Sequence, residues 1–132
     1  MFSPESIQNI SGIRFYNFNA KSTPRQLCWS WYIEMFDSTE LTSAICDDRM
    51  PEETINTSIV TNHGPLFCKF YSRGGYLCCS VHTTKTCACV VMVSGTEIII
   101  LPKNDTNVAA AICQDIHYRM RDKGITSSVS YH

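Results

Sequence analysis

The residues best suited to metal chemistry lie close together between positions 82 and 89. His82, Cys87 and Cys89 offer the imidazole and thiolate donors that zinc prefers. With a tight turn centred on residues 84–85, strand alternation puts His82 opposite Cys87, with Cys89 on the same face. Cys78 would share that face, but roughly 13 Å from His82, too far to complete one tetrahedral site. We therefore expect no bound metal or other cofactor, and zinc binding through these three residues is an alternative.

A cysteine-based enzyme is a second chemical hypothesis. Each of the four histidines could meet one of the eight cysteines in space and act as its base. Cysteines in buried strands, however, lack the exposed, electropositive surroundings that activate a thiol. Cys46, expected near a helix end, is followed by Asp47 and Asp48, whose negative charges disfavour a thiolate. We predict no catalytic residue, and the enzyme stays an alternative.

Two tryptophans in an aromatic segment are candidates for protein contact. Trp29 and Trp31 lie in residues 24–36, where a proline in the first turn favours a helix, although the pattern at 28–33 also suits a strand. On a helix, the rings of this segment would spread over more than one face. Some would fill the core, and we expect Trp29 and Trp31 to include anchors for a partner.

The elements that position these residues are predicted by a run of β-formers. Residues 66–72, 76–83, 86–93 and 96–101 are separated by short turns containing Gly74-Gly75, Thr84-Lys85 and Ser94-Gly95. This pattern is typical of an antiparallel meander over residues 66–101. Including one short strand at 56–61, we expect a sheet of four to six strands.

Alternation along these strands leaves neither face of the sheet polar. One face would carry Cys68, Phe70, Leu77, Cys79, Val81, Ala88, Val90, Met92 and Ile99. The second face would carry an apolar cluster on the last two strands, made of Val91, Val93, Ile98 and Ile100. An antiparallel sheet usually keeps one face in water, so either helices cover both faces or a partner covers one. We expect this cluster to bind protein and to form a homodimer about a two-fold axis.

Helices complete the predicted α+β fold. Residues 106–123, followed by Gly124, have a capped start and an apolar stripe at helical spacing. A capping box at Asp37–Glu40 predicts a short helix through Cys46. We expect one domain over residues 1–132, with loose ends at 1–8 and 125–132.

Charge and composition narrow the classes of partner and compartment. The net charge is −1, and the basic residues are scattered, which predicts no binding to nucleic acid or to a membrane surface. The chain starts without a basic, apolar leader and has no apolar run of membrane-spanning length. We therefore expect an intracellular protein, in the cytoplasm or nucleus, with reduced thiols that pack as small apolar groups.

Cysteine-weighted motifs are spread along the chain, namely Leu66-x-Cys68, Leu77-Cys78-Cys79-Ser80, Asn9-Ile10-Ser11-x-Ile13-Arg14, and the Trp29/Trp31 segment running into Thr39-Glu40-Leu41 and Cys46. In these motifs the chain resembles the cysteine-rich 34 kDa protein family of adenovirus early region four. That resemblance implies an adaptor that joins a viral partner to host elongin and cullin subunits in a ubiquitin ligase. The family's elongin-binding box has a leucine four residues before a cysteine. Here Leu41 precedes Cys46 by five, so only the class of small viral accessory protein is carried over.

The sequence therefore favours a non-enzymatic protein-binding or adaptor protein that engages host or viral proteins. The alternatives are the zinc-binding or cysteine-based enzyme described above. A further alternative is a cytoskeletal or trafficking module of the profilin or longin kind, which depends on fold analogy alone.

Overall fold

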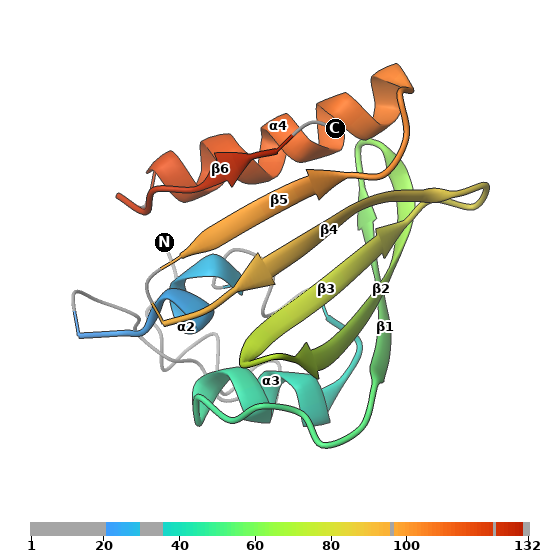
Figure 1. Cartoon of the computed structure of the whole chain (residues 1–132). Coiled ribbons are helices and arrows are strands. Elements are labelled where there is room, and N and C mark those ends of the chain that lie inside the picture. The colour runs from blue at the N-terminus through green and yellow to red at the C-terminus, as the bar shows by residue number, and fades with distance from the viewer. Residues whose placement is uncertain (1–20, 30–35, 96, 123, 131–132) are drawn as a thin grey trace, which may run out of the picture.

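A computed structural model describes residues 21–29, 36–95, 97–122 and 124–130 of the 132-residue chain. Within these ranges the chain forms three helices and six strands (Figure 1). In chain order they are α2 (Pro24–Trp29), α3 (Thr39–Cys46), β1 (Ile55–Thr61), β2 (Gly64–Arg73), β3 (Tyr76–His82), β4 (Cys87–Val93), β5 (Ile98–Pro102), α4 (Asn107–Asp122) and β6 (Ser128–Val129).

The six strands form one sheet in the order of the sequence, from β1 to β6. Neighbours from β1 to β5 pair antiparallel, and β6 joins β5 in parallel. The predicted α+β class, the meander and the C-terminal helix are thus confirmed. Gly74 and Gly75, at φ 57° and 83°, make the turn between β2 and β3, since glycine adopts positive φ without steric cost.

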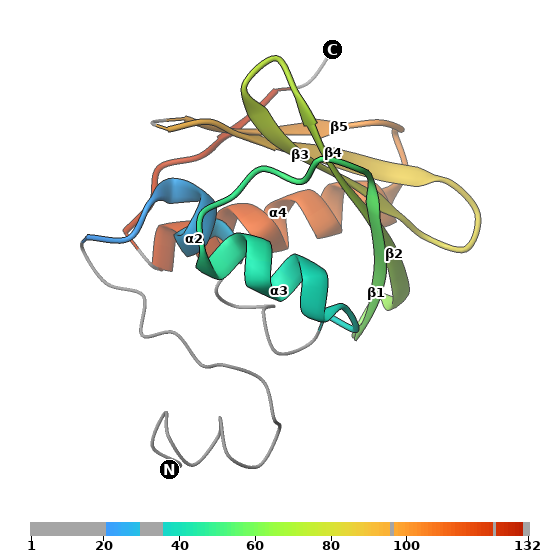
Figure 2. The same cartoon turned by 90° about the horizontal axis from the view of Figure 1, so that it is seen from below.

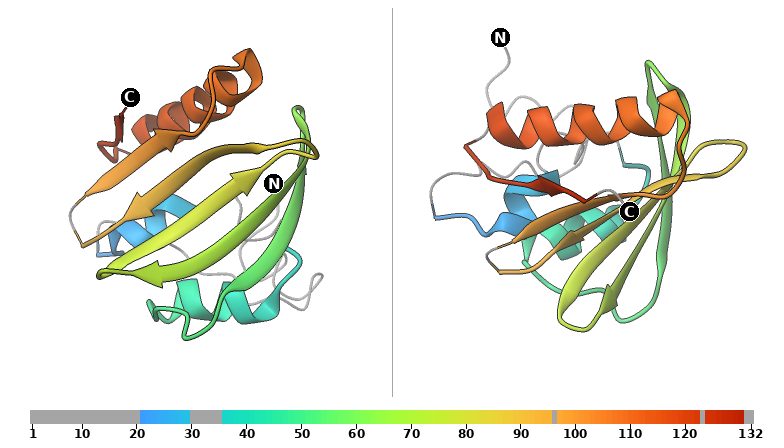
Figure 3. Two further views of the ribbon diagram at one scale, coloured as in Figure 1. Left: turned by 45° about the vertical axis from the view of Figure 1, so that its right-hand side comes forward. Right: turned by 45° about the horizontal axis from the view of Figure 1, so that its top comes forward.

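All three described helices lie on the same side of the sheet (Figure 2). We call the face that they cover the inner face and the opposite one the outer face. The outer face is turned toward the viewer in Figure 1 and in the left view of Figure 3, where strand β4 passes in front of α2. No helix among the described residues is long and apolar enough to cross a membrane.

The core lies between the inner face and the helices. Trp29 is only 3% exposed, and its ring meets that of Phe70 edge-on at a centroid distance of 4.9 Å. Phe36 packs against the same Phe70 ring at 5.3 Å. Trp29 is therefore a core residue and not the exposed anchor that the aromatic pattern predicted. Trp31, the other predicted anchor, lies outside the described residues.

A β-bulge in the hairpin of β3 and β4 reverses one part of the predicted face assignment. His82 pairs with Cys87 as expected, but Val81 pairs with Cys89, so that Ala88 is an extra residue on β4. Because strand side chains alternate, this single insertion exchanges the two faces along the rest of β4 and along β5. The cluster predicted to be a binding surface is in the core instead, with exposures between 0% and 2%: Val91, Val93, Ile98 and Ile100.

The C-terminal residues differ from the predicted loose tail. Ser128–Val129 forms β6 beside β5, and the Ser130 amide donates a hydrogen bond to the Ile100 carbonyl at 2.9 Å. Ile125 packs against the core, and the Ser127 hydroxyl lies 2.7 Å from Nδ1 of His117. β5 therefore is not an edge strand. The predicted loose segment at 1–8 lies outside the described residues.

Helices α2 and α3 form where the local sequence patterns predicted helices. Ser38 is the N-cap of α3, where its hydroxyl accepts a hydrogen bond from the Leu41 amide at 3.1 Å. The segment at 24–36 is helical over Pro24–Trp29, and residues 30–35 lie outside the description. The strand predicted at 56–61 is confirmed as β1.

Candidate functional site

The three residues proposed for zinc do not converge. His82 and Cys87 are cross-strand partners, as the sequence predicted. Cys89 is fully buried and pairs with Val81 on the inner face, because the bulge turns it away from Cys87. Over the described part of the chain, no three His, Cys, Asp or Glu side chains are grouped as metal ligands would be. The prediction that His82, Cys87 and Cys89 share one face was therefore wrong.

All eight cysteines are free, and several meet on the inner face. Cys79 and Cys68 share a hydrogen bond that lowers the pKa of Cys68, while burial raises the pKa of Cys79. Cys89 and Cys113 form a second pair, in which the shared hydrogen bond raises the pKa of Cys89 and lowers that of Cys113. The two pairs bring thiols of β2 and β3, and of β4 and α4, together in the core.

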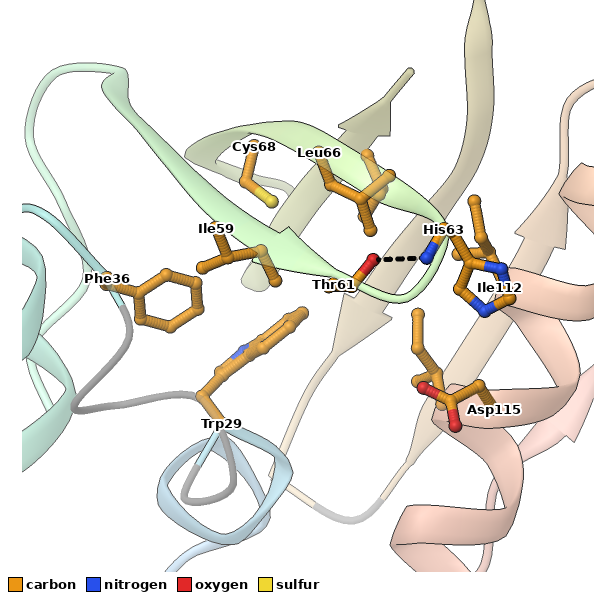
Figure 4. Close-up of a pocket in the computed structure, with 11 residues that line it drawn as sticks. Trp29, Phe36, Ile59, Thr61, His63, Leu66, Cys68, Ile112 and Asp115 are labelled. Atoms are coloured by element: carbon orange, nitrogen blue, oxygen red, sulfur yellow. Dashed lines mark hydrogen bonds between the residues drawn. The ribbon is translucent and has the colours of Figure 1, made fainter.

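A mostly apolar pocket lies between the β1–β2 hairpin, α2 and α4 (Figure 4). Its empty volume is about 400 Å³, open mouth included. Cys68 and His63 both line it, but Leu66 lies between them (Figure 4), and these two side chains share no hydrogen bond. The lining residues are Trp29, Phe36, Ile59, Thr61, His63, Leu66, Cys68, Val81, Ile112, Asp115 and Ile116.

Asp115 and His63, which also line this pocket, make local contacts. The Arg119 guanidinium donates to the Asp115 carboxylate at 3.1 Å, one turn along α4. The backbone amide of His63 donates to Thr61 Oγ1 at 3.1 Å, within the hairpin turn (Figure 4). The pocket therefore lacks the contact between thiol and imidazole on which a cysteine nucleophile depends.

The outer face of the sheet carries the other unusual feature of the described residues. Strand pairing places Tyr71, Cys78, Met92 and Ile99 in one row across β2, β3, β4 and β5. Two residues further along these strands, Val90 and Leu101 form a second row. We call these six side chains the outer apolar patch: Tyr71, Cys78, Val90, Met92, Ile99 and Leu101.

The outer apolar patch is partly open to solvent. Five of its six side chains are partly exposed, whereas Cys78 is buried, with 1% of its surface exposed. Phe67, on the same face of β2, is 45% exposed. Strand β1 shows the usual pattern instead, since its outward residues include the polar and exposed Asn56 and Ser58. Strand β3 also carries outward polar residues, Ser80 and His82. Antiparallel sheets normally put polar residues on a solvated face, so the apolar outer face of β4 and β5 is unusual.

Basic side chains border this patch. Lys69 and Arg73 lie two residues on either side of Tyr71 and are exposed on the same face of β2. Burial raises the pKa of the outward Cys87 thiol, and the positive charges of Lys103 and Lys69 oppose that rise. Arg73 opposes the rise that burial causes in the pKa of Cys78. These effects locate three cations around the outer apolar patch.

Sequence reasoning missed the members of this patch on β4 and β5. It assigned Val90, Met92 and Ile99 to the covered face, because the hairpin turn at residues 83–86 was placed correctly but the bulge after it was not foreseen. An extra residue in a strand leaves little local signal when its neighbours are all apolar. The available clue was that both alternating sets on β4 and β5 are apolar.

Comparisons of the chain with models of protein families, with curated proteins and with solved structures found no match. The function is therefore inferred from the side chains and surfaces described above.

Proposed function

We propose that this chain is a non-enzymatic protein-binding protein and that the outer apolar patch is its binding surface. The observation that carries this proposal is the partly exposed set of apolar side chains on β2 to β5, opposite the face that the helices cover. Protein interfaces combine such an apolar centre with a polar or charged border. Here Lys69 and Arg73 supply part of the border.

The energetics favour association over solvent exposure. Complete burial of one aliphatic or aromatic side chain contributes about 1.5–3 kcal/mol relative to full exposure. The patch residues are already partly covered, so each would contribute a fraction of that amount. The contributions of several adjacent side chains add up. Together with the more exposed Phe67, these side chains form a continuous apolar centre for an interface.

We also propose that the chain is a small intracellular viral accessory protein that engages host or viral proteins. This part of the proposal has separate support. It comes from the resemblance described above, and the free thiols agree with a reducing compartment. Four residues of the motifs that carry this resemblance point into the core: Leu66, Cys68, Leu77 and Cys79. These motifs therefore concern packing, and the identity of the partner is not carried over from the viral family.

A matched pair of variants tests the proposed surface. Met92→Asp places a charge at the centre of the outer apolar patch, while Val108→Asp changes a 48% exposed residue on α4 in the same way. Wild-type and variant proteins would be used to capture partners from cell extract, with quantification by mass spectrometry. We expect at least one partner whose recovery falls about tenfold or more with Met92→Asp and is unchanged with Val108→Asp.

Circular dichroism and thermal melting of both variants provide the folding control. Equal recovery of every captured protein by folded wild type and folded Met92→Asp would contradict the proposed surface.

A further inference from the structure

We propose that the partner presents an acidic segment to this face, with Asp or Glu residues beside the apolar residues that cover the outer apolar patch. This inference rests on the proposed function, since it names the chemistry of the partner at the same surface. The carboxylates would pair with the three bordering cations: Lys69, Arg73 and Lys103.

Most of the charges on this face are positive. The outward positions of β1 to β5 follow from the register, and the charged residues among them are Lys69 and Arg73, both basic. Lys103 directly follows β5, and its charge acts on Cys87 of the same face. Glu97, which directly precedes β5 and whose backbone carbonyl accepts a hydrogen bond from the Ser94 amide, is an exposed acidic residue at the opposite end of β5 from Lys103. The described part of this surface therefore combines apolar and neutral polar side chains with three basic residues and one acidic residue, an excess of positive charge.

Among the described residues, no carboxylate forms an ion pair with these three cations. The ion pairs among the described residues use four other arginines, namely Arg25, Arg49, Arg119 and Arg121. Lys69, Arg73 and Lys103 are exposed and form no side-chain ion pair within the described part of the chain. A carboxylate that approached them would neutralise a charge without breaking an existing pair.

The geometry also indicates how the segment would lie. Lys69 and Arg73 are four residues apart on β2, which corresponds to roughly 13 Å, and Tyr71 is between them. Lys103 lies on the far side of the patch, beyond the end of β5. A segment that crosses the patch would therefore meet cations on both sides of its apolar contacts.

Two other occupants fit these observations less well. A second copy bound through the same face about a two-fold axis would bring a second set of cations to the interface, and like charges there cost free energy. Nucleic acid binding draws mainly on many phosphate contacts, whereas this chain has 11 basic and 12 acidic residues and a net charge of −1. An acidic, apolar protein segment suits both the charge and the patch.

A phage-displayed library of random peptides, selected on immobilised full-length protein, provides a defined probe. An enriched peptide would then be synthesised, and its affinity measured by fluorescence anisotropy for wild type and for Lys69→Glu, Arg73→Glu and Met92→Asp. Lys85→Glu, at the exposed β3–β4 turn, makes the same charge change elsewhere and is the matched control. Met92→Ser is a second, milder patch variant, which tests the same surface if Met92→Asp does not fold.

We expect enriched peptides to combine apolar residues with Asp or Glu. Their affinity should fall roughly fivefold or more with Lys69→Glu or Arg73→Glu, fall with added salt, and stay unchanged with Lys85→Glu. Neutral or basic peptides whose binding is lost with Met92→Asp would overturn the acidic partner and leave the proposed function standing. A peptide affinity that is the same for wild type, Met92→Asp and Met92→Ser would overturn both proposals.

The same preparations test the other occupants. Sedimentation that shows a wild-type dimer abolished by Met92→Asp would identify a second copy as the occupant and overturn the acidic segment. Displacement of the peptide by an oligonucleotide, with oligonucleotide affinity lost in Lys69→Glu and Arg73→Glu, would overturn it in favour of nucleic acid.

Discussion

At the scale of single residues, the buried thiols are sensitive positions because each is surrounded by apolar groups. Cys79 is fully buried on the inner face and hydrogen-bonds with Cys68. Cys79→Ser would place a more strongly polar hydroxyl in this site, so we expect the free energy of unfolding to fall by roughly 1–3 kcal/mol. Urea denaturation measures this change.

The control for this experiment is Cys87→Ser, at a partly exposed position on the outer face. A hydroxyl there can reach water, so we expect a change within about 0.5 kcal/mol. Equal destabilisation by the two serine variants would show that the faces are assigned wrongly.

At the scale of elements, the bulge at Ala88 decides which residues of β4 and β5 are core and which are surface. Val91 is fully buried, whereas its neighbour Met92 is partly exposed on the opposite face. Val91→Asp would bury an unpaired charge, and we expect it to cost more than about 3 kcal/mol and to unfold much of the protein. Met92→Asp should remain folded, as thermal melting followed by circular dichroism would show.

The opposite result, a folded Val91→Asp and an unfolded Met92→Asp, would indicate a hairpin without the bulge. The same reasoning revises the expected behaviour of Val93 and Ile100. The homodimer expected through this cluster would have made aspartate at either position give a folded monomer, whereas their burial predicts an unfolded chain.

At the scale of the whole molecule, the core makes global stability depend on pH through its thiols. Burial raises the pKa of Cys28 far above its ordinary value of 9.0. Above about pH 9 the unfolded chain would lose this proton and the folded chain would keep it, so stability decreases as pH rises. The contribution is fully present below the ordinary pKa, and its loss approaches about 1.4 kcal/mol per pH unit.

Comparison with Cys28→Ala isolates this contribution from the lysines and tyrosines that also titrate at high pH. The variant should be less stable at about pH 7, because it lacks a buried group, but its stability should fall less steeply between about pH 9 and 10.5. Urea denaturation across this range measures both slopes. Parallel slopes would mean that Cys28 ionises equally in both states.

At the same scale, the described helices leave the outer apolar patch uncovered. α2, α3 and α4 all pack on the inner face, so the described sheet has one covered face and one that carries the outer apolar patch (Figure 2). The sequence showed that both faces are apolar, which left two alternatives: helices that cover both faces or a partner that covers one. It could not show which residues of β4 and β5 belong to which face.

Local patterns in the sequence were sufficient for the elements themselves. The meander, its glycine turn at Gly74-Gly75 and the C-terminal helix depend on alternation, turn residues and capping within a few positions, and all three were predicted. Tertiary structure decided the rest. The bulge at Ala88, the pairing of β6 with β5 and the burial of Trp29 each depend on contacts between distant segments. Because one extra strand residue exchanges the two faces, the residues of the outer apolar patch could be assigned only once the strands were paired.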